Sequence, residues 1–199
     1  KKAIELVKEE GENGAFSPNQ FSNEQNIMAH YLTTGKEITD KIKVDAFVSG
    51  IGTGGTLMGI AKRIKEQNPQ ALIYGLEPEN MTLIKENKVG THKIEGIGDE
   101  FIPEIVDTNI LTDVILVNDD DAINMSKKLA RELGFGVGIS SGANFLVAVQ
   151  IQEILNKNVV TVFPDDLKKY LSTDLAKDNK IEENCISNSI KLIDFEEII

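Results

Sequence analysis

The chain has 199 residues, of which 41% are hydrophobic, 27% are charged and 6% are aromatic. This length and apolar fraction suit one ordinary domain with a real core. Lys and Arg number 21 against 32 Asp and Glu, and the resulting net charge of -11 disfavours binding to nucleic acid or anionic lipid. A single cysteine, Cys185, excludes an internal disulfide and a cysteine-built zinc site. We therefore expect a soluble cytoplasmic protein without nucleic-acid, membrane or metal partners.

Glycine and proline separate a regular alternation of helical and strand-like patterns. The predicted elements are, in chain order, a helix over 2–10, a short strand within 16–21, helical stretches over 23–43 with a break at 33–35, a strand over 44–48, a helix over 56–66, a strand over 71–76, a strand over 113–117, a helix over 120–133, a helix over 141–155 and a strand over 158–163. Strands that alternate with helices imply right-handed crossovers and a parallel sheet. The sequence thus predicts an α/β fold with a mainly parallel sheet flanked by helices.

A glycine-rich turn joins the predicted strand over 44–48 to the predicted helix over 56–66. It reads Gly50-Ile51-Gly52-Thr53-Gly54-Gly55-Thr56. Glycines let the backbone approach a ligand closely, and the first N–H groups of the helix favour an anion, with phosphate as the natural guest. A turn without a ligand is the alternative, although four glycines in the six residues 50–55 exceed what a turn requires.

The same turn also fits a dinucleotide. Gly50-x-Gly52-x-x-Gly55 satisfies the dinucleotide-binding pattern, and Glu77 ends the next predicted strand where a ribose-binding acid is expected. This loop alone does not distinguish a nicotinamide-dependent dehydrogenase from a protein that binds only a phosphate group.

Several segments read together resemble one enzyme family. The segments are Gln20-Phe21-x-Asn23, His30-Tyr31-x-Thr33-Thr34-Gly35, Gly52-Thr53-Gly54-Gly55-Thr56, Glu77-Pro78, His92 to Gly98 with Phe101-Ile102-Pro103, Gly138 to Ala143, and Tyr170-Leu171-Ser172-Thr173. Their order and spacing over about residues 1–175 closely resemble the cysteine synthase/cystathionine β-synthase family of pyridoxal-phosphate enzymes, and within it the O-acetylserine sulfhydrylases. The resemblance makes the dehydrogenase interpretation a minor one. It implies the tryptophan-synthase-β-like fold, also called PLP fold type II.

The resemblance also implies a binding site for pyridoxal 5'-phosphate. The implied cofactor-binding residues are Gly52, Thr53, Gly54, Gly55 and Thr56 for the phosphate, and Ser140 for the pyridine nitrogen. The implied substrate-binding residues are Gln20, which resembles the family glutamine near the substrate carboxylate, and Gly96, Ile97 and Gly98 beside the substrate.

Each of these assignments has a structural alternative. Ser140 is also a candidate N-cap for the helix that follows, although Ser141 could take that role. Gln20 could be a solvated amide, and residues 96–98 could be an ordinary loop. We expect His30 and His92 to be structural, and we favour an ordinary loop at Asp165 and Asp166, where the family's Asp-Ser-Gly-x-Arg pattern is not kept.

The implied activity is the β-replacement of acetate by sulfide on O-acetyl-L-serine, which gives L-cysteine through an aminoacrylate. The family's cofactor-binding lysine lies in an Asn-Pro…Ser-x-Lys-Asp-Arg type segment, which these residues do not contain, so we nominate no catalytic residue. We expect that lysine in a missing N-terminal segment, with residues 1–22 as the remnant of a small N-terminal domain. Residues 23–175 would form the phosphate-binding domain, and 176–199 would form a peripheral tail.

Three further expectations accompany this assignment. The chain alone would be inactive, and the complete enzyme would be a homodimer. Cystathionine β-synthase-like β-replacement is the first alternative activity. A non-catalytic, cofactor-binding half-domain is the second.

Overall fold

The computed structural model describes residues 2–11, 14–177 and 184–198. Within these residues, four parallel strands form one sheet in the order β3-β2-β1-β4. The strands are β1 (Ala46–Gly50), β2 (Leu72–Pro78), β3 (Asp113–Val117) and β4 (Val159–Thr161). The α-helices are α1 (Lys2–Glu10), α2 (Glu24–Leu32), α3 (Thr34–Lys41), α4 (Gly55–Gln67), α5 (Leu83–Glu86), α6 (Asp119–Leu133) and α7 (Ile139–Leu155). The predicted parallel α/β architecture is confirmed.

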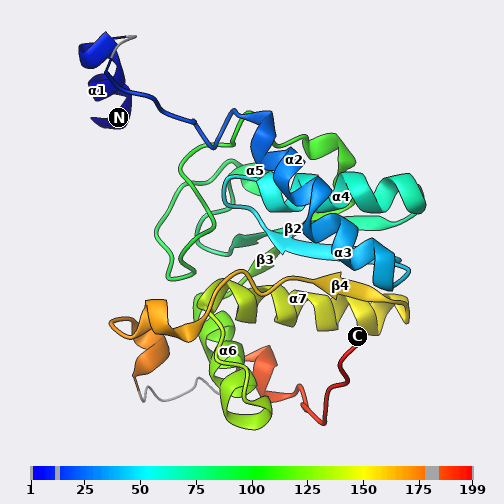
Figure 1. Ribbon diagram of the computed structural model, residues 1–199. Helices are drawn as coiled ribbons and strands as arrows, with labels where there is room; N and C mark the ends of the chain where they lie inside the picture. Colours follow the sequence, from blue (N-terminus) through cyan, green and yellow to red (C-terminus); the bar gives the residue numbers. More distant parts are fainter. Residues whose placement is uncertain (1, 12–13, 178–183, 199) are drawn as a thin grey trace.

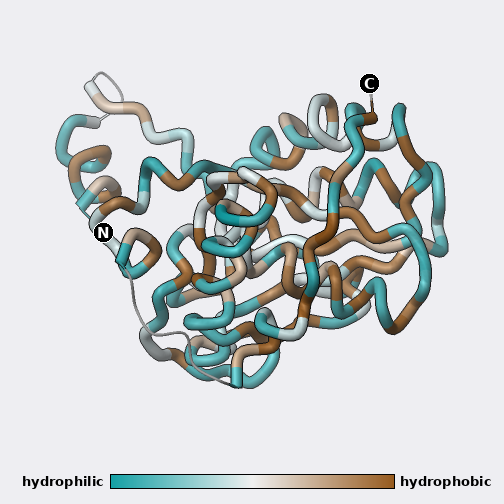
Figure 2. Tube along the Cα trace, turned by 90° about the horizontal axis from the view of Figure 1, so that it is seen from below, coloured by the Kyte–Doolittle hydropathy of each residue, from teal (hydrophilic) through white to brown (hydrophobic). Residues whose placement is uncertain are grey.

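Helices cover both faces of the sheet. In Figure 1, α2, α3, α4 and α5 lie on one side of the strands, and α6 and α7 lie on the other. Alternate residues of β1 point to opposite faces, so Ala46 and Val48 pack in the core beneath α6 and α7 while Phe47 packs in the core beneath α4. Figure 2 shows hydrophobic stretches running through the middle of the molecule and hydrophilic residues at many of the outer turns. The sheet is therefore buried on both sides, as parallel sheets generally are.

The order of the strands reverses beside β1. The chain proceeds from β1 to β2 and β3 in one direction, and β4 then pairs with the other edge of β1. In open parallel sheets, ligands bind in the crevice outside the carboxyl ends of the strands at such a reversal. The glycine loop that follows β1 opens at this point.

The strand predicted over 44–48 lies at Ala46–Gly50, and two other strand predictions differ more from the structure. The described residues 14–23 contain no strand, because Phe16 is 88% exposed with no neighbouring strand to pair with, and a turn begins at Asn19. The predicted strand over 158–163 is shorter and covers only Val159–Thr161. Strand-like composition alone was thus insufficient at both places.

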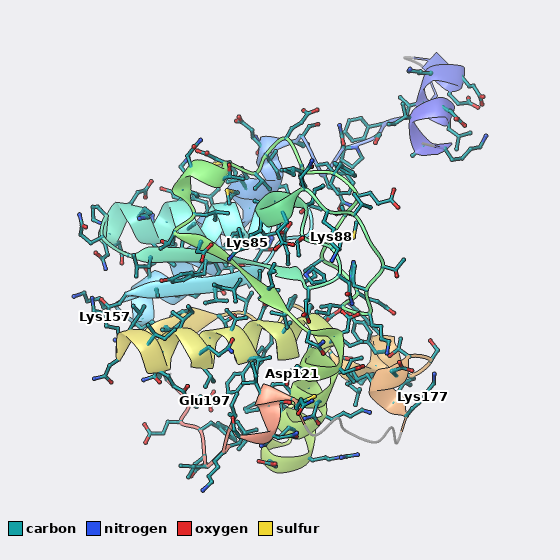
Figure 3. All side chains as sticks on the ribbon, turned by 180° about the vertical axis from the view of Figure 1, so that it is seen from behind. Lys85, Lys88, Asp121, Lys157, Lys177 and Glu197 are labelled. Carbon is teal, nitrogen blue, oxygen red and sulfur yellow. The ribbon has the colours of Figure 1, made fainter. Side chains whose placement is uncertain are left out.

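The C-terminal region is attached to α6. Residues 178–183 and 199 of the predicted tail lie outside the described residues. Beyond them, the Asp121 carboxylate accepts hydrogen bonds from Ile186 N and Ser187 N, both at 2.8 Å, and Asn124 donates to the buried Ser187 Oγ. Figure 3 shows Asp121 on α6 beside this segment. Residues 186–187 of the predicted tail are thus hydrogen-bonded to α6.

Candidate functional site

A pocket of about 200 Å³ opens where the strand order reverses. Four parts of the chain line it: the end of β1 with the glycine loop, residues 95–97, the first turns of α7, and residues 164–170 after β4. The predicted site residues that line it are Gly52, Thr53, Gly54, Thr56, Gly96, Ile97 and Ser140. The fold therefore brings together seven residues that are far apart in sequence.

The N-terminus of α4 faces this pocket without a side-chain cap. Gly54 is the N-cap residue, lies in the left-handed conformation with φ +90° and offers no side-chain cap, while Gly55 N makes a long hydrogen bond of 3.4 Å to Thr53 Oγ1. The N–H groups at a helix N-terminus and the helix dipole attract an anion, and Thr53 and Thr56 lie at the same end. This donor set fits a phosphate group.

The glycines of this loop are required by close contacts. A Cβ at Gly54 would lie 2.3 Å from Val106 Cγ2, and a Cβ at Gly52 would lie 2.4 Å from Gly96 O. Any side chain at these positions would push the glycine loop away from residues 96–106. The conformation of the glycine loop thus depends on glycine at these positions, and glycine also permits a close approach of the backbone to a ligand.

Ser140 lies inside the first turn of α7. The N-cap of this helix is Gly138, so the N-cap interpretation is wrong for both Ser140 and Ser141. Ser140 is buried and lines the pocket. Ser140 thus belongs to the pocket lining, and its contact with a ligand stays a prediction.

Asn144, one turn further along α7, is a site residue that the sequence reasoning missed. Its Oδ1 accepts a hydrogen bond from Gly50 N at 2.8 Å, and its Nδ2 donates to Val162 O at 2.8 Å. The side chain thereby joins the carboxyl ends of the segments that contain β1 and β4, and it lines the pocket. The signal available in the sequence was an amide four residues after Ser140 in a mostly apolar helix.

Asp165 lines the pocket as well, contrary to the ordinary loop that we favoured. Tyr170 donates from its hydroxyl to Asp165 Oδ2 at 2.6 Å. Burial and the Asp165 carboxylate raise the pKa of Tyr170, which therefore remains a protonated donor. Asp166 lies outside the pocket lining, and its side chain accepts from Lys168 N.

Three predicted residues do not line this pocket. Gln20 is exposed, and its backbone oxygen accepts from Asn26 Nδ2. Gly98 lies beside a smaller hollow that it shares with Gly52, where its N–H donates to Ile51 O. Gly55 is buried next to α2, and a Cβ at this position would lie 2.0 Å from Asn26 Oδ1. Their roles in binding remain predictions.

Glu77, the acid that the dehydrogenase alternative requires, is hydrogen-bonded to the start of α5. Glu77 is 4% exposed, and its carboxylate accepts from Ile84 N at 2.8 Å and Lys85 N at 3.2 Å. These bonds satisfy the first turn of α5, so the side chain has a structural function. Nothing in its position favours a ribose.

The described ranges also lack two other kinds of feature. They contain no group of three or more His, Cys, Asp or Glu side chains that could hold a metal ion. Within the same ranges, no helix is both long and apolar enough to span a membrane.

A parallel α/β sheet with a helix N-terminus, two threonines and a serine at its strand reversal suits the binding of a phosphate-bearing organic molecule. Residues 1–165 match the profile of the pyridoxal-phosphate dependent enzymes, and the chain belongs to that family. These enzymes use pyridoxal phosphate as their cofactor, and the donor set around Gly52–Thr56 fits its phosphate.

Known relatives define the family membership more closely. A cysteine synthase of Staphylococcus aureus is 42% identical over 180 residues, which cover 88% of this chain and 57% of the relative. The hydrogen sulfide-producing enzyme of Fusobacterium nucleatum is 48% identical with a TM-score of 0.89, over 99% of this chain and 60% of that one. The O-acetylserine dependent cystathionine β-synthase of Helicobacter pylori is 36% identical with a TM-score of 0.80, over 87% of this chain and 57% of that one.

These comparisons confirm the cysteine synthase-like family and the PLP type II fold that the motifs implied. The chain spans 57% of the length of the Staphylococcus relative.

Proposed function

We propose that this chain binds pyridoxal phosphate, with the backbone of Gly52–Thr56 around the phosphate and Ser140 beside the ring nitrogen. The uncapped start of α4, which shares one pocket with Ser140 and Gly96, carries the proposal. When bound, the cofactor withdraws electrons from the substrate's reacting carbons. A hydroxyl partner such as Ser140 does not require a protonated ring nitrogen, and this suits β-elimination better than full delocalisation of a carbanion.

We further propose that the protein is a cysteine synthase that replaces acetate by sulfide on O-acetyl-L-serine. The 42% identity to the Staphylococcus cysteine synthase supports this activity. Gly96 and Ile97 leave room beside the ligand, Gln20 and Gly98 contribute to substrate binding, and no lysine of these 199 residues is assigned to the cofactor. Residues 1–22, 23–175 and 176–199 are proposed as a small-domain remnant, the phosphate-binding domain and an appended tail of a cytoplasmic homodimer.

Cofactor binding can be tested on this chain directly. Titration with pyridoxal phosphate, followed by its absorbance and by equilibrium dialysis, should show saturable binding. Thr53→Val should weaken it by about three- to tenfold, because one hydrogen bond to the phosphate is lost. Thr108→Val removes a hydroxyl from an exposed residue outside the pocket lining and serves as the matched control. Equal affinity in all three proteins would refute the phosphate assignment.

The activity can be tested by a comparison of substrates on the protein that contains this chain. We expect faster formation of cysteine from O-acetylserine and sulfide than of cystathionine from serine and homocysteine. The opposite order would assign the protein to cystathionine β-synthase. Tight cofactor binding without turnover of either pair would favour the non-catalytic half-domain.

A second candidate function is the production of hydrogen sulfide. The observation that favours it is the 48% identity to the Fusobacterium enzyme over 99% of this chain. The same chemistry at the β-carbon, with cysteine as the substrate, expels sulfide instead of acetate. Sulfide released from cysteine alone, at a rate above that of cysteine synthesis, would establish this function in place of the first.

A further inference from the structure

Two side chains of α2, Asn26 and His30, contact the threonines of the glycine loop and the first turn of α4. Asn26 Nδ2 donates to Thr53 Oγ1 at 2.9 Å, and His30 Nε2 lies 3.1 Å from Thr56 Oγ1. Asn26 and His30 are four residues apart and so lie on one face of the helix. Both threonines that line the pocket are therefore hydrogen-bonded to the same helix face.

Small residues on α4 make this approach possible. A Cβ at Gly55 would lie 2.0 Å from Asn26 Oδ1, and a Cβ at Gly59 would lie 2.4 Å from Ile27 O. Any larger residue at these positions would force α2 away from α4. The contact between α2 and the loop is thus built into the packing of the two helices.

The chemistry of phosphate fixes the direction of these hydrogen bonds. The phosphate dianion has only acceptor oxygens, so a Thr56 hydroxyl that binds it must donate its hydrogen. Thr56 Oγ1 is then left to accept a hydrogen bond, and His30 Nε2 is in place to donate one. A neutral imidazole with its hydrogen on Nε2 has a free acceptor at Nδ1.

Thr34, in the first turn of α3, supplies the remaining donor. Its Oγ1 lies 3.3 Å from His30 Nδ1. Burial lowers the pKa of His30, which favours the neutral imidazole with a single N–H group. When Thr56 donates to a phosphate and His30 is neutral, the hydrogen bonds along this row of three side chains can run in one direction only.

We infer that Thr34, His30 and Thr56 form a directed chain of hydrogen bonds that points the Thr56 hydroxyl hydrogen at a phosphate in the pocket. The Thr34 hydroxyl donates to His30 Nδ1, His30 Nε2–H donates to Thr56 Oγ1, and the Thr56 hydroxyl donates to a phosphate oxygen. His30 and Thr34 are positioning residues, because they act through Thr56. The inference rests on the proposed function, since it requires a phosphate-bearing ligand.

Two adjacent threonines offer a matched test. Thr34→Val removes the donor to His30 Nδ1, whereas Thr33→Val removes a hydroxyl that donates to Ala29 O at 2.7 Å. Dissociation constants are measured for pyridoxal phosphate and for inorganic phosphate. Thr34→Val should weaken both ligands by about three- to tenfold, the effect of one neutral hydrogen bond, while Thr33→Val should leave both nearly unchanged. Thermal midpoints of both variants show whether the fold is kept.

The position of the hydrogen can be observed by NMR. The chain contains two histidines, His30 and His92, so His92→Gln identifies the ¹⁵N signals of His30 by elimination. In the wild type with ligand, Nε2 should carry the hydrogen and Nδ1 should show the shift of an unprotonated nitrogen. His30→Gln retains an N–H donor and should bind phosphate better than His30→Leu, which a purely space-filling role would not produce.

The outcomes separate the two proposals. A wild-type chain that binds neither pyridoxal phosphate nor inorganic phosphate refutes the proposed function and this inference together. A wild type that binds, with the hydrogen on His30 Nδ1 or with Thr34→Val equal to Thr33→Val, refutes the inference alone. A hydrogen on Nε2 together with weaker binding in Thr34→Val and His30→Leu establishes it.

Discussion

Two helices of this protein, α4 and α6, occupy similar places after a strand but differ in how their N-termini are capped. Both α4 and α6 directly follow a parallel strand, but α6 is closed by its own side chains. Asn118 accepts from Asp120 N at 2.9 Å and Asp121 N at 3.2 Å, and three aspartates occupy the first turn. At α4, Gly54 gives no side-chain cap, and the first turn has no acidic residue.

The two helix starts differ in whether the N-cap side chain supplies a hydrogen-bond acceptor. The first N–H groups of any helix lack partners within it and must find them elsewhere. In α6 the protein supplies these partners, and Asp121 also holds the C-terminal segment. In α4 the N-cap residue offers no side-chain acceptor, and Gly55 N makes only a long hydrogen bond of 3.4 Å to Thr53 Oγ1, so this helix start is open to an anion. The following experiments alter one helix start at a time.

The largest effect is expected from Gly54→Ala. The left-handed conformation costs an alanine roughly 1–2 kcal/mol, and its Cβ would also lie 2.3 Å from Val106 Cγ2. We expect the dissociation constant for pyridoxal phosphate to rise more than tenfold, because the loop must move. Gly134→Ala is the control, since Gly134 is also left-handed but would place its Cβ within 4 Å of no other atom. If both variants bind like the wild type, the loop shape is not needed for binding.

An intermediate effect is expected from Asn118→Ala, which removes the cap of α6. The free energy of unfolding should fall by about 1 kcal/mol, as is typical for the loss of such a cap. Affinity for pyridoxal phosphate should stay the same, because Asn118 is not among the pocket residues. Chemical denaturation and ligand titration on the same preparation check both statements. Weaker ligand binding in this variant would show that the two helix starts are coupled.

The smallest effect concerns Asp119 in the first turn of α6. Burial raises the pKa of this carboxyl above its ordinary value of 3.8, although a backbone hydrogen bond from Lys93 and nearby positive charges oppose the shift. The resulting stabilisation is fully present below pH 3.8 and is lost as the pH rises through the native pKa. Asp119→Asn should therefore be slightly more stable than the wild type at pH 7, and this gain should vanish near pH 3.

Thermal unfolding between pH 3 and 7 measures this difference. The control is Asp120→Asn, which loses an ion pair with Lys93 and should be no more stable than the wild type at pH 7. An Asp119→Asn variant that is less stable at every pH would contradict the assigned direction.

The sequence allowed the sheet and the glycine loop that lines the pocket to be predicted, because both depend on local patterns. Periodicity identified the helices, and the glycines around Thr53 required a close contact. Ser140 was found only through the resemblance, since a serine near a helix start is equally typical of a cap. The structure then showed that Gly138 holds that position.

What could not be predicted depends on contacts between distant segments. Asn144 belongs to the pocket because α7 packs against both β1 and β4, and no local pattern reports that register. Asp165 faces the pocket because Tyr170 holds it, and an acidic pair in a loop is more often solvated. The strand expected within residues 16–21 is absent from the described structure for the opposite reason, since its composition suited a strand but no partner lies beside it.

The two hydrogen bonds of Asn144 mean that two segments of the pocket become ordered when the chain folds. One amide side chain sets the separation between the glycine loop and the segment after β4, and it does so through bonds that need no ligand. The opening thus has its width as soon as the chain has folded. The loss of entropy in arranging these two segments therefore falls on folding rather than on ligand binding.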